Sequence, residues 1–193
     1  MIIIKHRINT LEKIKKTSND YGVEIDLRSS NNKIYLNHDP FKRGVIFEKW
    51  IKLFNHKILV LNVKEEGLEK FIIKILKKYR INNYFFHDQS FSSMLLTKNS
   101  SPVSIRFSEF EDIKKLKQIS KKIKWVWVDH FTRFPLVKKK FSEFKRYKMR
   151  ICIVSPELVK KSWKFKIKNL KKIMRQNQIN VDAVCTKHPK LWK

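Results

Sequence analysis

Residues 58–79 read ILVLNVKEEGLEKFIIKILKKY and change hydrophobic period within one stretch. The first six residues form an apolar run rich in β-branched side chains, which is typical of a buried strand. The apolar residues that follow recur at the i, i+3, i+4, i+7, i+8 and i+11 spacing of an amphipathic helix; they are Leu68, Phe71, Ile72, Ile75, Leu76 and Tyr79. The stretch therefore predicts one strand followed by one helix, with Lys70, Lys74, Lys77 and Lys78 on the solvated face of that helix.

The same alternation of short apolar runs and helical segments extends over the whole chain. The strand-like runs are residues 2–5, 23–27, 34–36, 58–63, 84–86, 103–107, 125–128, 151–154 and 181–185. Further helical stripes occupy residues 46–54, 113–123 and 163–174, and Asn9-Thr10 offers a cap for a helix that begins near Leu11. Strands that alternate with helices form a parallel sheet with helical crossovers.

Eight strands remain when residues 34–36 are taken as a hairpin partner of the strand before them. Eight strand–helix repeats predict an α/β fold of the small (β/α)8 TIM barrel type, with residues 1–193 as a single domain. A doubly wound open sheet is the alternative architecture. Because no glycine-rich phosphate loop follows the first strand, a nucleotide-binding version of that sheet is disfavoured.

The charge of the chain is strongly positive. Its 193 residues include 45 Lys and Arg against 17 Asp and Glu, which gives a formal net charge of +28. A hydrophobic fraction of 42% excludes a largely disordered basic tail. The charge fits a nucleic-acid partner, a lysine-rich exterior, or attraction to an anionic substrate or membrane surface. Nucleic acid is disfavoured, because the lysines are spread over the chain and no recognition helix or RNA-binding motif is found.

The cysteines and the apolar runs indicate the cellular compartment of the protein and whether it crosses a membrane. Cys152 and Cys185 lie in apolar runs without metal-ligand spacing, which predicts buried, reduced thiols and a cytoplasmic protein. The apolar run after Met1 has only three residues, and no stretch approaches 18 apolar residues. We therefore expect a soluble protein without a transmembrane segment. Peripheral contact with a membrane and the oligomeric state stay open.

Polar side chains follow the first apolar runs, at the strand ends where a barrel has its active site. Glu24 and Asp26 are two residues apart on one strand, so both carboxylates point to the same side. A hard divalent cation would relieve their repulsion. The other polar residues at these ends are His6, Arg7, His38, Asp39, Asn62 and Lys64. Two histidines can act as general acid and base, and an arginine with a lysine can hold a phosphate. Each feature alone has an ordinary explanation as an ion pair or a turn; their combination indicates a site.

The order His6-Arg7, Glu24-x-Asp26 and His38-Asp39-Pro40 resembles the glycerophosphodiester phosphodiesterase family. That family belongs to a superfamily of barrel enzymes that includes phosphatidylinositol-specific phospholipases C and sphingomyelinase D. The resemblance covers essentially the whole chain and points to a bacterial branch, through residues 61–67, 84–88, 106–109, 125–129, 155–158 and 182–189. It implies a phosphoric diester hydrolase with one divalent cation, Mg²⁺ or Ca²⁺.

The resemblance also implies individual roles. His6 and His38 match the catalytic histidines, Arg7 matches the phosphate-contacting arginine, and Glu24 and Asp26 match two metal ligands. The family usually has a third carboxylate ligand where this chain has Asn62, two residues before the retained Lys64. An amide oxygen can also bind a divalent cation, although one fewer negative charge weakens the site. Two further departures are Lys187, where many relatives have an aspartate, and the missing glycine after Arg7. Asp129 ends its strand and is a candidate substrate contact.

These features predict metal-assisted, two-histidine cleavage of a glycerophosphodiester or a related small or lipid phosphodiester, as in lipid metabolism. The identity of the leaving group, the choice between a substrate hydroxyl and water as nucleophile, and the division of roles between His6 and His38 stay open. The alternative is a catalytically weak or inactive barrel that binds anionic lipid, polysaccharide or nucleic acid through its basic surface. The replacement of a carboxylate ligand by Asn62 motivates that alternative.

Overall fold

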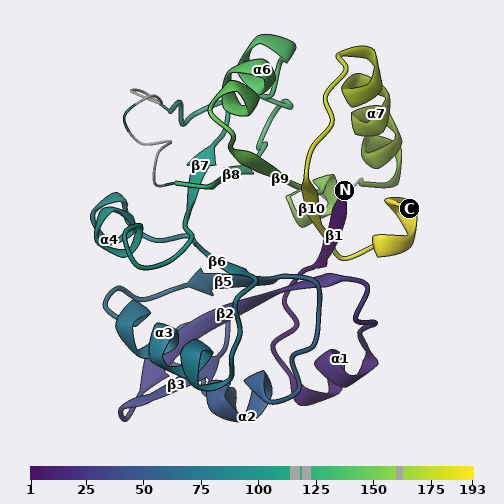
Figure 1. Cartoon of the computed structure of the whole chain (residues 1–193). Helices are drawn as coiled ribbons and strands as arrows, with labels where there is room; N and C mark the ends of the chain where they lie inside the picture. The colour runs from purple at the N-terminus through teal and green to yellow at the C-terminus, as the bar shows by residue number, and fades with distance from the viewer. Residues whose placement is uncertain (114–117, 119–122, 160–162) are drawn as a thin grey trace. The chain divides into compact units, whose positions relative to one another are not determined.

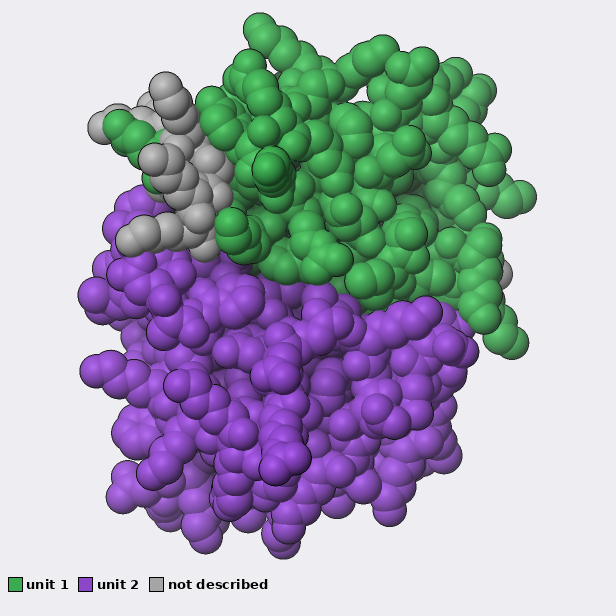
Figure 2. Space-filling view, in the orientation of Figure 1, with its two compact units in different colours: residues 1–4, 104–193 green, residues 5–103 purple. Residues whose placement is uncertain are grey.

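The computed structural model describes residues 1–113, 118, 123–159 and 163–193. The chain divides into two compact units, which Figure 2 shows in different colours. Residues 5–103 form one unit, and residues 1–4 together with 104–193 form the other. Both units combine strands with helices, as the labels in Figure 1 show.

The unit of residues 5–103 is built on five strands. Its elements are α1 (Leu11–Lys16), β2 (Gly22–Ser30), β3 (Lys33–Leu36), β4 (Val45–Ile46), α2 (Phe47–Ile51), β5 (Leu59–Val63), α3 (Glu69–Lys78), β6 (Tyr84–His87) and α4 (Phe91–Thr97). The strand order is β4-β3-β2-β5-β6, in which β2, β5 and β6 are parallel. Strand β3 is antiparallel to β2 and to β4, which confirms the expected hairpin.

Register within this sheet aligns three polar residues. Asp26 of β2 is the register partner of Asn62 of β5, and Asn62 is the partner of His87 of β6. Register partners on adjacent strands point to the same side of a sheet, so these side chains share one side. All five residues of β5 are buried, which accounts for its nearly continuous apolar sequence, because a parallel strand inside a sheet is covered on both faces.

The second unit has the strand order β1-β10-β9-β8-β7, with parallel ladders from β7 to β10. Its elements are β1 (Ile2–Lys5, of which Lys5 belongs to the other unit), β7 (Ser104–Phe107), β8 (Trp125–Val128), α6 (Lys138–Arg146), β9 (Arg150–Val154), η1 (Pro156–Leu158), α7 (Trp163–Gln176), β10 (Ala183–Thr186) and η2 (Pro189–Leu191). Cys152 and Cys185 are buried in β9 and β10 without a disulfide, as expected.

Most of the predicted elements are confirmed. The predicted strands agree with the observed ones to within two residues at each end, except that β2 continues to Ser30, three residues beyond the predicted end; residues 58–79 contain β5 and α3. The cap of α1 is Thr10 rather than Asn9, since the Thr10 hydroxyl accepts from the Lys13 amide at 3.2 Å. Periodicity did not predict β4, α4 or α6, and the stripe of residues 113–123 lies largely outside the described residues.

Among the described residues, no helix combines the length and the apolar character that a bilayer crossing needs.

Gly44 lies where the chain returns from the loop after β3 into β4. A Cβ at this position would overlap the backbone carbonyl oxygen of Leu36. Because that neighbour is backbone in a paired strand, it cannot turn aside as a side chain would. Gly44→Ala is therefore expected to lower the free energy of unfolding by about 1–3 kcal/mol, measured by urea denaturation. Arg43→Ala, its exposed neighbour, should stay within about 0.5 kcal/mol of the parent. Equal stability of Gly44→Ala and Arg43→Ala would contradict the steric argument.

Candidate active site

Strand β2 places two carboxylates side by side in the protein interior. The Glu24 side chain is 1% exposed and the Asp26 side chain is fully buried. The two oxygens of Glu24 accept different donors: Oε2 accepts from the Arg7 amide at 2.7 Å, and Oε1 accepts from Asn62 Nδ2 at 2.9 Å. These donors hold the carboxylate in one orientation.

Asp26 is held by an amide and flanked by two cations. Asn9 Nδ2 donates to Asp26 Oδ2 at 2.8 Å, and the Asp26 amide donates back to Asn9 Oδ1 at 3.0 Å. Arg7 Nε lies 3.7 Å from Oδ2, and Lys64 Nζ lies 3.8 Å from Oδ1. Lys64 also pairs with Asp88 at 2.7 Å, so the ammonium group stands between two carboxylates.

The turn after β1 brings His6 and Arg7 against Glu24. His6 Nε2 lies 3.9 Å from Glu24 Oε2. Arg7 adopts φ +54°, a left-handed conformation that costs an L-residue about 1–2 kcal/mol. Two hydrogen bonds to one residue hold this turn, since the Arg7 amide donates to the Glu24 carboxylate and the Ile8 amide donates to the Glu24 carbonyl at 2.8 Å. Both site residues of the turn are thus oriented by Glu24.

The acidity of Glu24 reflects this environment. Burial, followed by the charge of Asp26, raises the pKa of the Glu24 carboxyl from 4.5 to about 7. The hydrogen bonds from Asn62 and the Arg7 amide, together with the charge of Lys64, act in the opposite direction. A cation close to both carboxylates would favour their ionised forms.

The donor set fits a hard divalent cation. Asp26 Oδ1 and Asn62 Oδ1 are buried oxygens that have no hydrogen-bond partner among the described residues, which normally costs about 1–3 kcal/mol each. They come from register partners on adjacent strands, and such cations take oxygen ligands. No group of three His, Cys, Asp or Glu side chains suited to a metal occurs among the described residues. In this cluster the third oxygen donor is an amide, that of Asn62.

His38 lies in the loop after β3 and is tied to the site through backbone. The Asn37 amide donates to the Asp26 carbonyl at 3.1 Å. Arg28 Nε and Nη2 both donate to the His38 carbonyl at 3.1 Å. The His38 ring contacts Asp39 Oδ1 through Nδ1 at 3.0 Å and is 40% exposed on its side chain. Its other ring nitrogen can therefore face solvent or a substrate.

The structure brings six of the eight predicted site residues into one cluster: His6, Arg7, Glu24, Asp26, Asn62 and Lys64. His38 is not among them by direct hydrogen bond or ion pair within the described chain. Its loop is joined to β2 through the Asn37 amide and through the two bonds from Arg28 to the His38 carbonyl. Asp129 belongs to the other unit, where Arg106 Nε lies 3.2 Å from its Oδ2 and Trp127 Nε1 donates to its Oδ1. Its role as a substrate contact stays a prediction.

Three residues in or beside the cluster were not among the predicted site residues. Asn9 was considered only as part of the Asn9-Thr10 cap, and its side chain exchanges two hydrogen bonds with Asp26. His87 had no role, although it is buried and in register with Asn62. Asp88 follows the strand-like run of residues 84–86, and its carboxylate pairs with Lys64 at 2.7 Å. The only signal for the last two was their position at the end of a strand that neighbours β5.

Comparison with known proteins gives a match at the level of fold. No family model matches the chain, and no curated protein matches it significantly. The backbone is similar to a structure from Galdieria sulphuraria assigned to the glycerophosphodiester phosphodiesterases, with TM-score 0.75 and 16% identity, covering 99% of this chain and 96% of that one. An Oleispira antarctica phosphodiesterase in complex with the product sn-glycerol-3-phosphate gives TM-score 0.73 and 14% identity, with 100% and 95% coverage.

A glycerophosphodiester phosphodiesterase from Thermotoga maritima gives TM-score 0.69 and 19% identity, with 100% and 96% coverage. At these identities the likeness establishes the fold. It confirms the fold class that the strand–helix alternation predicts, an α/β fold of the TIM-barrel type, and it agrees with the resemblance seen in the sequence.

Glu24→Gln tests the cost of burying this carboxylate. An acid whose pKa is raised on folding binds more protons folded than unfolded between about pH 4.5 and 7. Its contribution to stability therefore falls as pH rises through that window. Glu24→Gln removes the charge, so its free energy of unfolding relative to the parent should increase from pH 5 to pH 8, measured by urea denaturation with chelator present. The exposed Glu66→Gln should show no such trend. A variant that loses relative stability toward pH 8 would refute the assignment.

Proposed function

We propose that this chain is a metal-dependent phosphodiester hydrolase of the glycerophosphodiester phosphodiesterase type. The observation that carries the proposal is the buried Glu24–Asp26–Asn62 cluster, with two unsatisfied oxygens and with His6, Arg7 and Lys64 around it. A structural ion-pair network would use all of its acceptors, whereas this cluster leaves oxygen donors open beside two cations. The fold likeness to glycerophosphodiester phosphodiesterases supports the same reading.

Glu24, Asp26 and Asn62 would hold one divalent cation, Mg²⁺ or Ca²⁺, through oxygen. Such a cation supplies Lewis acidity toward a phosphate oxygen and a template for the substrate. Asn62 would contribute its free Oδ1, because its Nδ2 is engaged by Glu24. With one carboxylate fewer than a fully acidic site, the affinity depends on keeping Glu24 and Asp26 ionised.

Arg7 and Lys64 would bind the phosphodiester. Both side chains reach Asp26 at distances longer than a hydrogen bond, 3.7 and 3.8 Å, so their donors are not saturated by it. An arginine offers a fork of donors and a lysine a point charge, and together they would stabilise charge that develops on the phosphate oxygens.

His6 and His38 would exchange the protons. One of them takes the proton of the nucleophile, a substrate hydroxyl or water, and the other gives a proton to the leaving alkoxide. His6 is 14% exposed and next to Glu24, whereas His38 is 40% exposed and next to Asp39. The substrate would be a glycerophosphodiester or a related small or lipid phosphodiester. The product named for the Oleispira antarctica neighbour, sn-glycerol-3-phosphate, makes glycerophosphodiesters the first substrates to test.

Loss of either histidine should abolish turnover while the fold is kept. His6→Ala and His38→Ala are each expected to lower the rate of nitrophenol release from bis(p-nitrophenyl) phosphate, with Mg²⁺ or Ca²⁺ present, by roughly 10²–10⁴-fold. Chelator should abolish the activity of the parent, and circular dichroism should show unchanged folding.

His188→Ala is the matched control and should retain the activity of the parent. A rate of nitrophenol release equal to that of the parent in His6→Ala or His38→Ala would contradict the proposed mechanism. Absence of hydrolysis by the parent with every metal and with glycerophosphodiesters would favour a barrel that only binds anionic ligands.

Arg28 holds the His38 loop in place. Its guanidinium donates twice to the His38 carbonyl and reaches Glu65 Oε1 at 3.4 Å through Nη1. Glu65 is itself fixed by the amide of Ser29 at 2.8 Å and by the Ser29 hydroxyl at 2.6 Å. Burial opposes these contacts, yet the net effect lowers the pKa of Glu65, so the carboxylate stays charged opposite Arg28. Arg28 is therefore a positioning residue that acts through His38.

Arg28→Ala should lower kcat by roughly 10–100-fold with little change in KM, because the loop that carries a reacting group would lose its anchor. Arg28→Lys retains one donor and should recover part of kcat. Arg43→Ala, on the same loop but exposed, is the control and should leave kcat unchanged. A rise in KM at constant kcat would instead assign Arg28 to substrate binding.

A further inference from the structure

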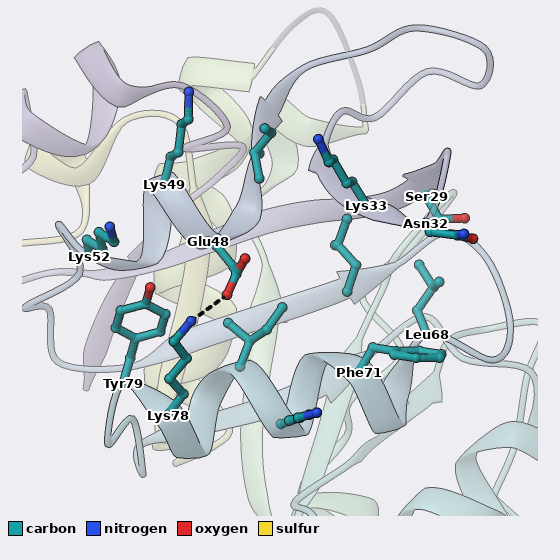
Figure 3. Close-up of a pocket in the computed structure, with 14 residues that line it drawn as sticks. Ser29, Asn32, Lys33, Glu48, Lys49, Lys52, Leu68, Phe71, Lys78 and Tyr79 are labelled. Carbon is teal, nitrogen blue, oxygen red and sulfur yellow. Dashed lines mark hydrogen bonds and ion pairs between the residues drawn. The ribbon is translucent and has the colours of Figure 1, made fainter.

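A groove of about 1040 Å³ lies on the outside of the unit of residues 5–103. One wall is α3 with the residues at its ends, and the other wall is formed by the β2–β3 hairpin, β4 and α2 (Figure 3). Its volume is slightly above the range of about 300–1,000 Å³ that is typical of ligand pockets. None of the proposed catalytic, metal-binding or phosphate-binding residues lines it.

The floor of this groove is apolar. Ile34, Ile46, Leu68 and Ile75 contribute aliphatic side chains from both walls. Phe71 adds a ring that is 65% exposed, and Figure 3 shows it beside Leu68 at one end of α3. A large aromatic side chain left open beside a hollow is apolar surface that a ligand can bury, at about 25 cal/mol per Å².

The rim of the groove is cationic. Five lysines line it, namely Lys33, Lys49, Lys52, Lys74 and Lys78, against the single carboxylate of Glu48. Lys78 and Glu48 pair at 3.1 Å and join the two walls near Tyr79 (Figure 3). Within the described part of the chain, none of the other four ammonium groups forms an ion pair. The groove therefore presents unpaired positive charge above an apolar floor.

This combination selects among anionic ligands. A polyanion such as nucleic acid would be complementary in charge to the lysines but would leave the apolar floor exposed to solvent. A peptide would bring backbone amides and carbonyls that need hydrogen-bond partners, and the uncharged polar side chains of the lining are only Ser29, Asn32 and Tyr79. An alkyl chain has no such requirement. Lysine stems can also pack along a chain while their ammonium groups reach a head group.

We propose that this groove is a binding site for a single-chain anionic amphiphile, that is, a phosphate or carboxylate head group on one alkyl chain. The chain would cover Phe71 and the aliphatic floor, and the head group would meet the unpaired lysines of the rim. The site is separate from the proposed catalytic cluster and does not depend on turnover.

Calorimetric titration with dodecyl phosphate, below its critical micelle concentration, tests the proposal. We expect one dodecyl phosphate per chain in the groove. Binding should weaken about tenfold or more in Lys49→Ala/Lys74→Ala, and also in Phe71→Ala. The controls have the same chemistry elsewhere: Lys168→Ala/Lys172→Ala removes two exposed lysines of α7, and Phe91→Ala removes a ring that is 60% exposed. Both controls should bind like the parent.

The two halves of the ligand are tested separately. Dodecyl maltoside carries the chain without the charge and inorganic phosphate carries the charge without the chain, so each should bind at least about tenfold more weakly than dodecyl phosphate at the groove.

Arg7→Ala should retain groove binding, whereas loss of all binding in that variant would assign the ligand to the catalytic cluster and overturn the proposal. Equal weakening by the Lys168/Lys172 control would show attraction to overall charge. Binding only to phosphatidylglycerol vesicles or to a dT12 oligonucleotide, without dodecyl phosphate binding, would also overturn it.

Discussion

The burial of two carboxylates side by side on β2 is the constraint on which the rest of this unit depends. An i, i+2 pair on a strand cannot turn apart, because both side chains leave the same face of the sheet. With both groups out of water, repulsion between them is large, and burial together with the charge of Asp26 raises the pKa of Glu24 to about 7 despite the opposing hydrogen bonds. The surrounding residues offset the cost of burying the two carboxylates by supplying hydrogen-bond donors and positive charge. Nearly every contact of the cluster has this effect.

The compensation is divided between neutral and charged donors. Glu24 receives a backbone amide and a side-chain amide, whereas Asp26 receives the Asn9 amide and lies between Arg7 and Lys64 at longer range. Amides orient a carboxylate without neutralising it, and cations at 3.7–3.8 Å attract it without occupying its lone pairs. The net result is a pair of oriented acceptors with open oxygen, instead of a closed salt bridge. Buried acceptors left open in this way lower the stability of the fold, and the proposed cation would offset that cost.

The sequence pattern predicts the local elements, that is, the strands and helices. It does not predict contacts between residues that are far apart in the sequence and that the fold brings together. The strand runs, the α3 stripe and the same-side placement of Glu24 and Asp26 follow from periods of 2.0 and 3.6 residues and were predicted correctly. Asn62 was selected because it lies near the end of a strand-like run and matches the position of a family ligand, and the structure places it in register with Asp26. The Asn9-Thr10 pair was correctly predicted to cap the helix through Thr10, but the contact of Asn9 with Asp26, seventeen residues later in the chain, is seen only in the structure. The spacing of residues in the sequence could not predict that Arg28 anchors His38, because the guanidinium binds the backbone carbonyl of His38 and not its side chain.

The net charge of +28 separates into groups that differ physically. Lys64 is only 16% exposed and lies between two carboxylates, so salt in the solvent screens it little. The lysines of the α3 face and the groove rim are exposed, and their attraction for an anion falls with ionic strength over a Debye length of about 8 Å at physiological salt. Raising the salt should therefore weaken anion binding at the groove before it affects the cluster around Asp26. The net charge alone describes neither group of lysines. Burial and ion pairing, and not the number of lysines, decide how strongly each ammonium group attracts an anion.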